Sequence, residues 1–393
     1  MTRLGSASPV VAGNLLLAEV RQNPYPFYRE LRRYAPVCGD GPAGSYLVSR
    51  YGDVLFVLKN ASLFSSSIMD RADQTLLGAD PPAHTRIRRI VNRAFSLQRM
   101  AALVGRIRMT AELMVQQMIQ RERSDLMLDL AIPLPLQIIA EMLGIEPQRH
   151  ADLKGWSEAV VMEASGIAPH NVAGLKASVA EFNFFFHDLI ERRRQAPAGD
   201  LISALMHCED KAESLTAEET WSFAKLLLIA GNETTTNLIG NSMLALLAHP
   251  THLAKVQETP SHVDNVIEET LRYDTPVQFV QRRTTQDVEL SGTCIPAHAS
   301  VIALLGSANR DERQFNNPDR FDPERRSNDN LAFGSGPHFC LGASLARQEA
   351  TIALEVLLSR MRDVRAAESL EEVPRITAMQ LRGPARLILS HSP

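Results

Sequence analysis

The sequence has no apolar run long enough to cross a membrane. The longest apolar stretch near its start, residues 10–20, is broken by Gly13, Asn14 and Glu19. A bilayer span needs about 20 mostly apolar residues. A signal peptide needs a basic start and a cleavage pattern, both of which are missing here. We therefore expect a soluble, cytoplasmic protein with no membrane attachment.

Cysteine is scarce, with four residues in the 393-residue chain. They are Cys38, Cys208, Cys294 and Cys340, and none forms a C-x-x-C pair or lies close to another. This spacing argues against a zinc ribbon and against a disulfide framework. We expect three of the four to be ordinary thiols. The remaining question is whether one of the four has a chemical function.

Blocks of positive charge are also missing. The formal net charge is −4, and no Lys/Arg run of the kind that binds phosphates is present, which argues against nucleic-acid binding. Apolar residues make up 45% of the chain and charged residues 22%, as expected for a globular protein with a large core. Because no repeat or change of composition marks a linker, we expect a single domain over residues 1–393.

Helical periodicity dominates the middle of the chain, from residue 84 to residue 247, and a short helix is expected over residues 26–33. Strand-like segments are short and few. They comprise residues 45–48, 54–57, 287–290, 301–305 and 385–389. The pattern predicts a mainly α protein with small β-sheets.

One predicted helix is unusually long. Thr216 and Glu219 form a capping box that should start it, and nothing ends it firmly before His249 and Pro250. It would contain roughly 30 residues and extend on the order of 45 Å. Its apolar centre is followed by Gly231 and the polar residues 232–236. Glycine lowers the stability of a helix, and buried polar side chains lower it further unless they form hydrogen bonds. Two interpretations stay open: a tolerated kink whose threonines bond back to the preceding turn, or a bend that opens a slot for a small ligand.

The segment from Phe333 to Gly342 carries the strongest chemical signal. The spacing of Gly334, Gly336, Cys340 and Gly342 predicts a tight loop wrapped around a flat group. A helical pattern begins at Ala343. Cys340 therefore precedes a helix N-terminus, where the helix dipole favours a thiolate. A lone thiolate in such a loop suits haem iron.

This segment resembles the signature of the cytochrome P450 family, F-G-x-G-x-H-x-C-x-G. Its fixed positions are occupied by Phe333, Gly334, Gly336, His338, Cys340 and Gly342. Three further matches follow the family order: residues 48–54, the E-x-x-R pair Glu269 and Arg272, and residues 308–323. The resemblance implies a cytochrome P450 fold with haem b between the long central helix and the cysteine loop.

The resemblance also implies roles for individual residues. Cys340 would bind the iron, and Phe333 and Gly342 would shape the cofactor site. The haem propionates would be bound by His84, Arg88, Arg282 and His338, with Arg283 as the alternative if the register is off by one. Gly231 would leave room above the iron, and Glu233 and Thr234 would form the proton relay that serves dioxygen activation.

The implied activity is that of a monooxygenase that hydroxylates or epoxidises a small, largely apolar molecule: a terpenoid, a steroid-like, a fatty or a polyketide-like compound. Electrons would come from a separate ferredoxin and its ferredoxin reductase, and we expect a monomer. The ferredoxin would dock on arginines of the cysteine side. The candidates are Arg86, Arg89, Arg93 and Arg347. Two alternatives rank lower: a haem-thiolate isomerase or dehydratase that does not use dioxygen, and a non-catalytic haem protein that binds a ligand.

The substrate pocket is the least defined part. By family position it would be lined by residues 64–77, 160–176, 277–280 and 378–381 and by the turns that face Leu227 and Ala230. These stretches are mostly apolar, with Gln278 as an occasional polar group.

Overall fold

The computed structural model describes residues 15–39, 41–68, 76–95, 97–165, 172–207 and 214–391. The chain forms two compact units. Unit 1 comprises Met1–Asp70, Gly240–Cys340 and Glu368–Leu387, and unit 2 comprises Arg71–Ile239, Leu341–Ala367 and Ile388–Pro393. Because each unit is assembled from alternating segments, neither is a continuous stretch of chain. The expected single domain stays a prediction.

Unit 1 contains a five-stranded sheet. In spatial order its strands are β1 (Val37–Cys38), β2 (Tyr46–Val48), β8 (Ser300–Ala303), β5 (Val280–Thr284) and β3 (Phe64–Ser65). β2 and β8 run parallel, with Leu47 opposite Ile302, and the other neighbours run antiparallel. A separate hairpin pairs β6 (Val288–Leu290) with β7 (Thr293–Ile295). The predicted strands near residues 45–48, 287–290 and 301–305 are thus confirmed.

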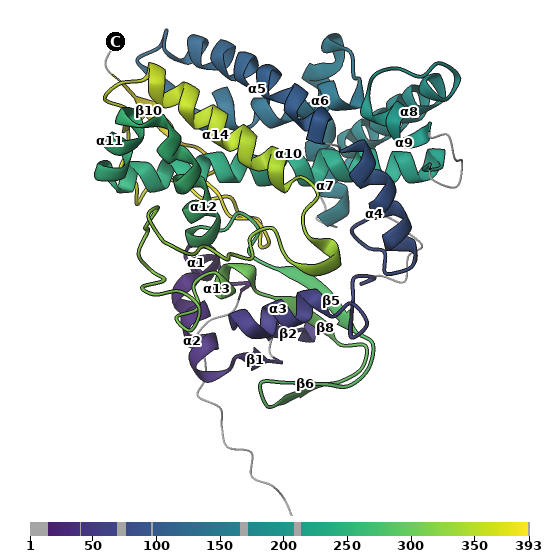
Figure 1. The fold of residues 1–393 in the computed structure, drawn as a ribbon, viewed down its shortest axis with the longest axis vertical. Coiled ribbons are helices and arrows are strands. Elements are labelled where there is room, and N and C mark those ends of the chain that lie inside the picture. The colour runs from purple at the N-terminus through teal and green to yellow at the C-terminus, as the bar shows by residue number, and fades with distance from the viewer. Residues whose placement is uncertain are drawn as a thin grey trace, which may run out of the picture. The chain divides into compact units, whose positions relative to one another are not determined.

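Unit 1 also contains helices, of which α3 packs against strand β8 of this sheet (Figure 1). They are α1 (Ala18–Gln22), α2 (Tyr25–Tyr34), α3 (Tyr51–Lys59), α11 (Pro250–Glu258), α12 (Val263–Tyr273) and α13 (Leu305–Ala308). α2 confirms the short helix expected over residues 26–33. The strand expected over residues 54–57 is wrong, because this segment lies within α3. Val54, Val57 and Leu58 are buried while Phe56 is exposed, so the apolar run follows helical spacing rather than alternation.

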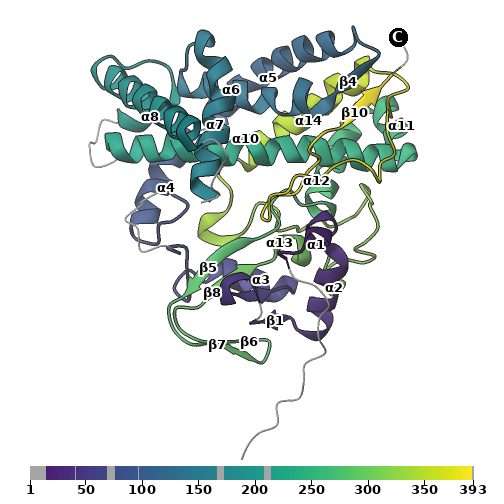
Figure 2. The ribbon, with the colours of Figure 1, turned by 180° about the vertical axis from the view of Figure 1, so that it is seen from behind.

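Unit 2 is almost entirely helical. Its helices are α4 (Ala83–Ala94), α5 (Leu97–Met118), α6 (Pro133–Leu143), α7 (His150–Ser165), α8 (Val172–Gln195), α9 (Leu201–Met206) and α14 (Ala343–Arg360). α14 packs against α5, and α7 packs against α8 (Figure 2). A small antiparallel sheet joins β4 (Arg123–Asp125), β10 (Ile388–Ser390) and β9 (Arg365–Ala366). The mainly α architecture with small sheets is confirmed.

The long helix expected from the capping box is α10 (Ala217–Ala248), a single helix of 32 residues. Thr216 and Glu219 cap it reciprocally: the Thr216 N–H donates to Glu219 Oε2 at 2.9 Å, and the Glu219 N–H donates to Thr216 Oγ1 at 3.1 Å. Among the described residues, none of the helices combines the length and the apolar character that a bilayer crossing requires.

Candidate functional site

The cysteine loop of unit 1 has a backbone that its glycines make possible. Gly334 and Gly336 adopt φ angles of 69° and 70°, in the left-handed region that other residues rarely occupy. A Cβ on Gly336 would lie 2.6 Å from the backbone oxygen of Leu58, so α3 approaches the loop too closely for any side chain. The Cys340 N–H donates to the Phe333 carbonyl at 2.9 Å and closes the loop.

The thiol of Cys340 is half-buried and is not part of a disulfide. It lies two residues before Gly342, which is the N-cap of the 18-residue helix α14. The unpaired N–H groups at a helix N-terminus carry a partial positive charge, so this position favours an anionic sulfur. The sequence-based placement of Cys340 before a helix is confirmed.

Two basic side chains of the predicted cofactor site belong to unit 1, His338 in the loop itself and Arg282 on β5. The Nε2 atom of His338 lies 2.9 Å from the hydroxyl of Ser66, a partner that the sequence did not reveal. Arg282 lies on β5 and is 8% exposed, and one of its guanidinium nitrogens donates to the Gln281 carbonyl at 2.7 Å. Arg283 is the less buried of the two neighbours. Burial therefore favours Arg282 over Arg283 as the site residue.

Unit 2 contributes a second basic pair, His84 and Arg88, one turn apart on α4. His84 is 2% exposed. Burial lowers the pKa of His84, and the positive charge of Arg88 lowers it further, while Asp80 opposes the shift. A neutral, buried imidazole beside a guanidinium can donate a hydrogen bond to an anion without adding a second buried charge.

The polar residues at the centre of α10 bond back along the helix. The Thr234 hydroxyl donates to the Ala230 carbonyl at 2.7 Å, and the Thr235 hydroxyl donates to the Gly231 carbonyl at 3.0 Å. The helix is continuous here, and these two bonds are those that the first interpretation expects. A Cβ on Gly231 would lie 2.9 Å from Cδ1 of Ile139, so packing against α6 is one reason for this glycine.

Glu233 is mostly buried on α10. Burial raises the pKa of its carboxyl, and the negative charge of Glu158 on α7 raises it further. A carboxyl group with a raised pKa carries its proton at a higher pH than usual and is therefore suited to proton transfer near neutral pH.

The chemistry of the donor set fits a haem. Among the described residues, no group of three or more His, Cys, Asp or Glu side chains could hold a metal ion by itself. A lone thiolate just before a helix N-terminus suits haem iron, to which it donates electron density. The buried His84 and Arg282 suit the carboxylates of that porphyrin.

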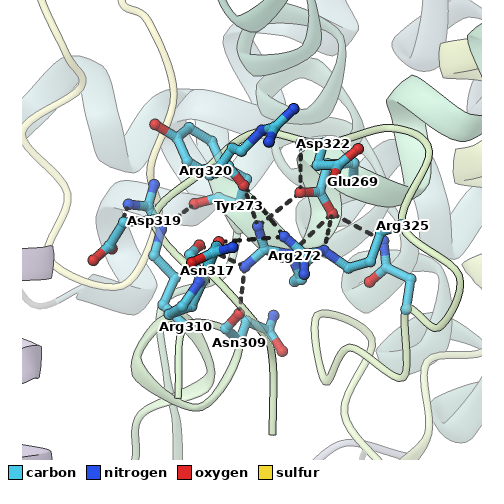
Figure 3. A network of polar contacts seen from close by, with 12 residues as sticks. Glu269, Arg272, Tyr273, Asn309, Arg310, Asn317, Asp319, Arg320, Asp322 and Arg325 are labelled. Atoms are coloured by element: carbon cyan, nitrogen blue, oxygen red, sulfur yellow. Dashed lines mark hydrogen bonds and ion pairs between the residues drawn. The ribbon is translucent and has the colours of Figure 1, made fainter. Parts of the chain in front are cut away.

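The E-x-x-R pair lies in a buried network of unit 1 (Figure 3). Glu269 and Arg272 on α12 are 1% and 0% exposed and form a two-pronged ion pair with distances of 2.7 and 2.9 Å. Arg272 also donates to three backbone carbonyls beyond β8. These belong to Asn309, Pro318 and Arg320. The pair therefore fixes the irregular chain that leads to the cysteine loop, and the predicted match has a structural role.

Two of the stretches expected to line the pocket lie together in unit 1. Val277 forms a bridge with Leu381, and the Gln278 N–H donates to the Gln380 carbonyl at 2.7 Å. Gln278 itself is 3% exposed, and its side-chain amide donates to the Thr275 carbonyl at 2.6 Å and packs against Gly306. These contacts hold the Gln278 side chain against the chain of unit 1, and its pocket role stays a prediction. Residues 69–75 and 166–171, as well as Cys208, lie outside the described residues.

One of the predicted docking arginines has an internal partner. Arg86 forms an ion pair with Glu219, the capping residue of α10, and one of its nitrogens donates to the Ser214 carbonyl at 3.4 Å. Arg86 is therefore a poor candidate for a partner contact. Arg89 and Arg93 are exposed on α4, and Arg347 is half-buried on α14.

Comparison with known proteins gives matches over most of the chain. A family profile described as Cytochrome P450 matches residues 174–364. The chain is 42% identical over 360 residues to Cytochrome P450 109 of Bacillus spizizenii, covering 89% of this chain and 88% of that protein.

Solved structures match over nearly the full length. Cytochrome P450 CYP109Q5 from Chondromyces apiculatus superposes with a TM-score of 0.90 at 41% identity, covering 98% of this chain and 99% of that one. CYP109E1 from Bacillus megaterium, solved in complex with corticosterone, superposes with a TM-score of 0.87 at 34% identity, covering 95% and 99%.

Proposed function

Because the chain belongs to the cytochrome P450 family of haem b oxidoreductases, we propose that Cys340 is its iron ligand and that it hydroxylates or epoxidises a small apolar molecule. The observation that carries this proposal is the cysteine loop. Its two left-handed glycines and the bond from the Cys340 N–H to the Phe333 carbonyl hold the thiol at the start of α14. When bound, a haem with a thiolate ligand supplies the activation of dioxygen.

The remaining cofactor contacts follow from burial and charge. We assign the propionates to His84, Arg88, Arg282 and His338, and the walls of the cofactor site to Phe333, Gly342 and Gly231. The low exposure of His84 and Arg282 supports this assignment, because a carboxylate is a strong acceptor for hydrogen bonds from buried imidazole and guanidinium groups.

Glu233 and Thr234 are assigned to proton delivery. The raised pKa of Glu233 keeps a proton available on a mostly buried carboxyl. The Thr234 hydroxyl donates to the Ala230 carbonyl at 2.7 Å, and its oxygen can accept a hydrogen bond at the same time. The carboxyl group of Glu233 can therefore supply protons, and the hydroxyl group of Thr234 can position them.

A rigid molecule of steroid size is the substrate class that we favour. The described part of the pocket wall, where Val277 bridges Leu381, is apolar at these two positions, and the similar CYP109E1 binds corticosterone in its solved structure. Apolar walls with few polar groups suit such a molecule.

Electrons are proposed to come from a separate ferredoxin-type protein that docks on unit 2. Arg89, Arg93 and Arg347 remain the candidate contacts, since their charges suit an acidic partner. Replacing Arg89 and Arg93 by glutamate should slow haem reduction by ferredoxin at least several-fold and leave reduction by dithionite unchanged. Arg33→Glu, an exposed charge reversal on α2 of unit 1, is the matched control.

The decisive experiment measures whether NADPH and dioxygen are consumed when a steroid, ferredoxin and ferredoxin reductase are supplied. A monooxygenase forms product with one dioxygen per turnover, and Glu233→Gln should lower product formation by roughly 10²-fold or more. An isomerase or dehydratase would form product without consuming dioxygen. A ligand-binding protein would give a spectral shift and no product.

A further inference from the structure

Thr236 on α10 carries a buried hydroxyl that the proposed chemistry does not use. The residue is 7% exposed, and its hydroxyl donates to the Ala131 carbonyl at 2.9 Å, across 105 positions of the chain. The hydroxyls of Thr234 and Thr235 donate to carbonyls of α10 itself. Thr236 instead joins the centre of α10 to a different element of unit 2.

The Ala131 carbonyl can accept this bond because of the sequence that follows it. Ala131 ends the π-helical turn η2 (Met127–Ala131), and α6 begins at Pro133. In a continuous α-helix the carbonyl of Ala131 would accept from the N–H four residues later, but that residue is Pro135, which has no N–H. Ala131 is fully buried, and a buried carbonyl without a partner is costly. Thr236 supplies the hydrogen bond that the proline cannot give.

This bond lies on one side of α10, and the residues assigned to proton delivery lie on the other. At about 100° per residue, Gly231 and Thr236 fall within one arc of roughly 140°. Glu233 and Thr234 fall outside this arc, on the opposite side of the helix. A Cβ on Gly231 would lie 2.9 Å from Cδ1 of Ile139, so α6 approaches the first side closely. One side of α10 is thus held at two points, and the other side carries the acid and the alcohol.

We propose that Thr236 is a positioning residue for proton delivery: its bond to the Ala131 carbonyl sets the rotation of α10 about its axis and thereby the direction of Glu233 and Thr234. This inference rests on the proposed function, because it concerns the two residues assigned to proton delivery. Apolar packing is non-directional, whereas a hydrogen bond weakens steeply as its angle changes. Without the bond, α10 can turn by a small angle while its packing against α6 is kept.

The test uses the haem-loaded enzyme and four variants. Thr236→Val removes the hydroxyl at nearly constant shape, and Thr236→Ser retains it. The double variant, Thr236→Val with Pro135→Ala, gives the Ala131 carbonyl the helical N–H that proline lacks, but restores no bond to α10. Thr220→Val is the matched control, because Thr220 is a fully buried residue of α10 whose hydroxyl donates to the preceding Thr216 carbonyl at 2.8 Å.

Three measurements separate positioning from stability. The midpoint of urea unfolding measures whether the buried carbonyl is satisfied. The infrared C–O stretch of the carbon monoxide complex of the reduced protein reports on the side chains that face the bound gas. The third measurement is the share of NADPH that yields hydrogen peroxide instead of product when corticosterone, ferredoxin and ferredoxin reductase are supplied.

The wild type, Thr236→Ser and Thr220→Val should share one C–O band and a similar share of peroxide. Thr236→Val should unfold at a lower urea concentration, show a shifted or an additional C–O band, and give a several-fold larger share of peroxide. The double variant should regain the unfolding midpoint, because its carbonyl has a partner, and should keep the altered band and the larger share of peroxide.

The inference would be overturned if either the band or the share of peroxide is unchanged in Thr236→Val. It would also be overturned if the wild-type band returns in the double variant, because Thr236 would then act only as a partner for the buried carbonyl. If Thr236→Val alone does not fold, the double variant decides. Absence of any product in the wild type would count against the proposed function, and the C–O bands alone would then decide the inference.

Discussion

Three buried acids of this protein show how the partner decides the protonation state. The charge of Glu269 is matched by Arg272 on the same helix. Asp274 contacts Arg375 and Arg382, and these positive charges hold the pKa of its carboxyl far below the usual range despite burial. Burial raises the pKa of Glu349 to about 8, and the side chain of Thr235 opposes this shift. Glu269 and Asp274 are therefore partners in buried ion pairs, whereas burial dominates at Glu349.

Removing the guanidinium of Arg272 should unfold much of unit 1. Arg272→Ala leaves the Glu269 carboxylate buried without its main partner and releases three backbone carbonyls. Breaking a buried ion pair in this way costs about 3–5 kcal/mol, which urea unfolding would measure. Arg194→Ala, in the exposed pair with Glu191, is the control and should leave the midpoint unchanged. Equal effects of the two substitutions would contradict the structural role.

At the scale of elements, the cysteine loop depends on two glycines for different reasons. Both have positive φ angles, but a Cβ on Gly336 would meet the Leu58 backbone at 2.6 Å, whereas on Gly334 the nearest atom is 3.9 Å away. Gly334→Ala should therefore cost only the strain of the left-handed conformation, about 1–2 kcal/mol. Gly336→Ala should in addition displace the loop from α3. We expect near-normal haem content in the first variant and a severe loss in the second, measured as haem absorbance per protein.

The capping box of α10 gives a second prediction at this scale. Thr216→Ala removes the hydroxyl that accepts from the Glu219 N–H at 3.1 Å. Loss of such a cap costs about 1 kcal/mol. The free energies of unfolding of the unmodified and the substituted protein, measured in urea, should differ by this amount. Equal free energies would mean that the cap does not stabilise α10.

The sequence predicted those features that depend on local spacing. The capping box, the length of α10 and the position of Cys340 before α14 all follow from motifs within a few residues. The strand expected over residues 54–57 was wrong because a short apolar run can also place Val54, Val57 and Leu58 on one helix face. The sequence signal for Glu349, a lone acid on an apolar helix face, was present but overlooked. Ser66 and Ile139 could not be predicted, because their contacts join segments far apart in the chain.

At the scale of the whole molecule, buried and half-buried histidines should limit stability in acid. Burial is the largest cause that lowers the pKa values of His84, His252 and His262. The unfolded chain binds these protons near pH 6.5, whereas the folded protein binds them only at lower pH. The free energy of unfolding should therefore fall as the pH decreases below about 6.5.

His262→Asn should reduce this acid dependence, because it removes one of the three groups. Urea unfolding at a series of pH values measures the slope. A slope that is unchanged in the variant, or a stability that rises in acid, would contradict this prediction.

The central claim is that Cys340 binds haem iron as a thiolate. Its most direct test is the absorption spectrum of the dithionite-reduced protein with carbon monoxide, compared with that of Cys340→Ser. The account predicts a strongly red-shifted Soret band that disappears in the variant. A Soret band typical of histidine ligation in the unmodified protein, or a red-shifted band that persists without Cys340, would contradict it.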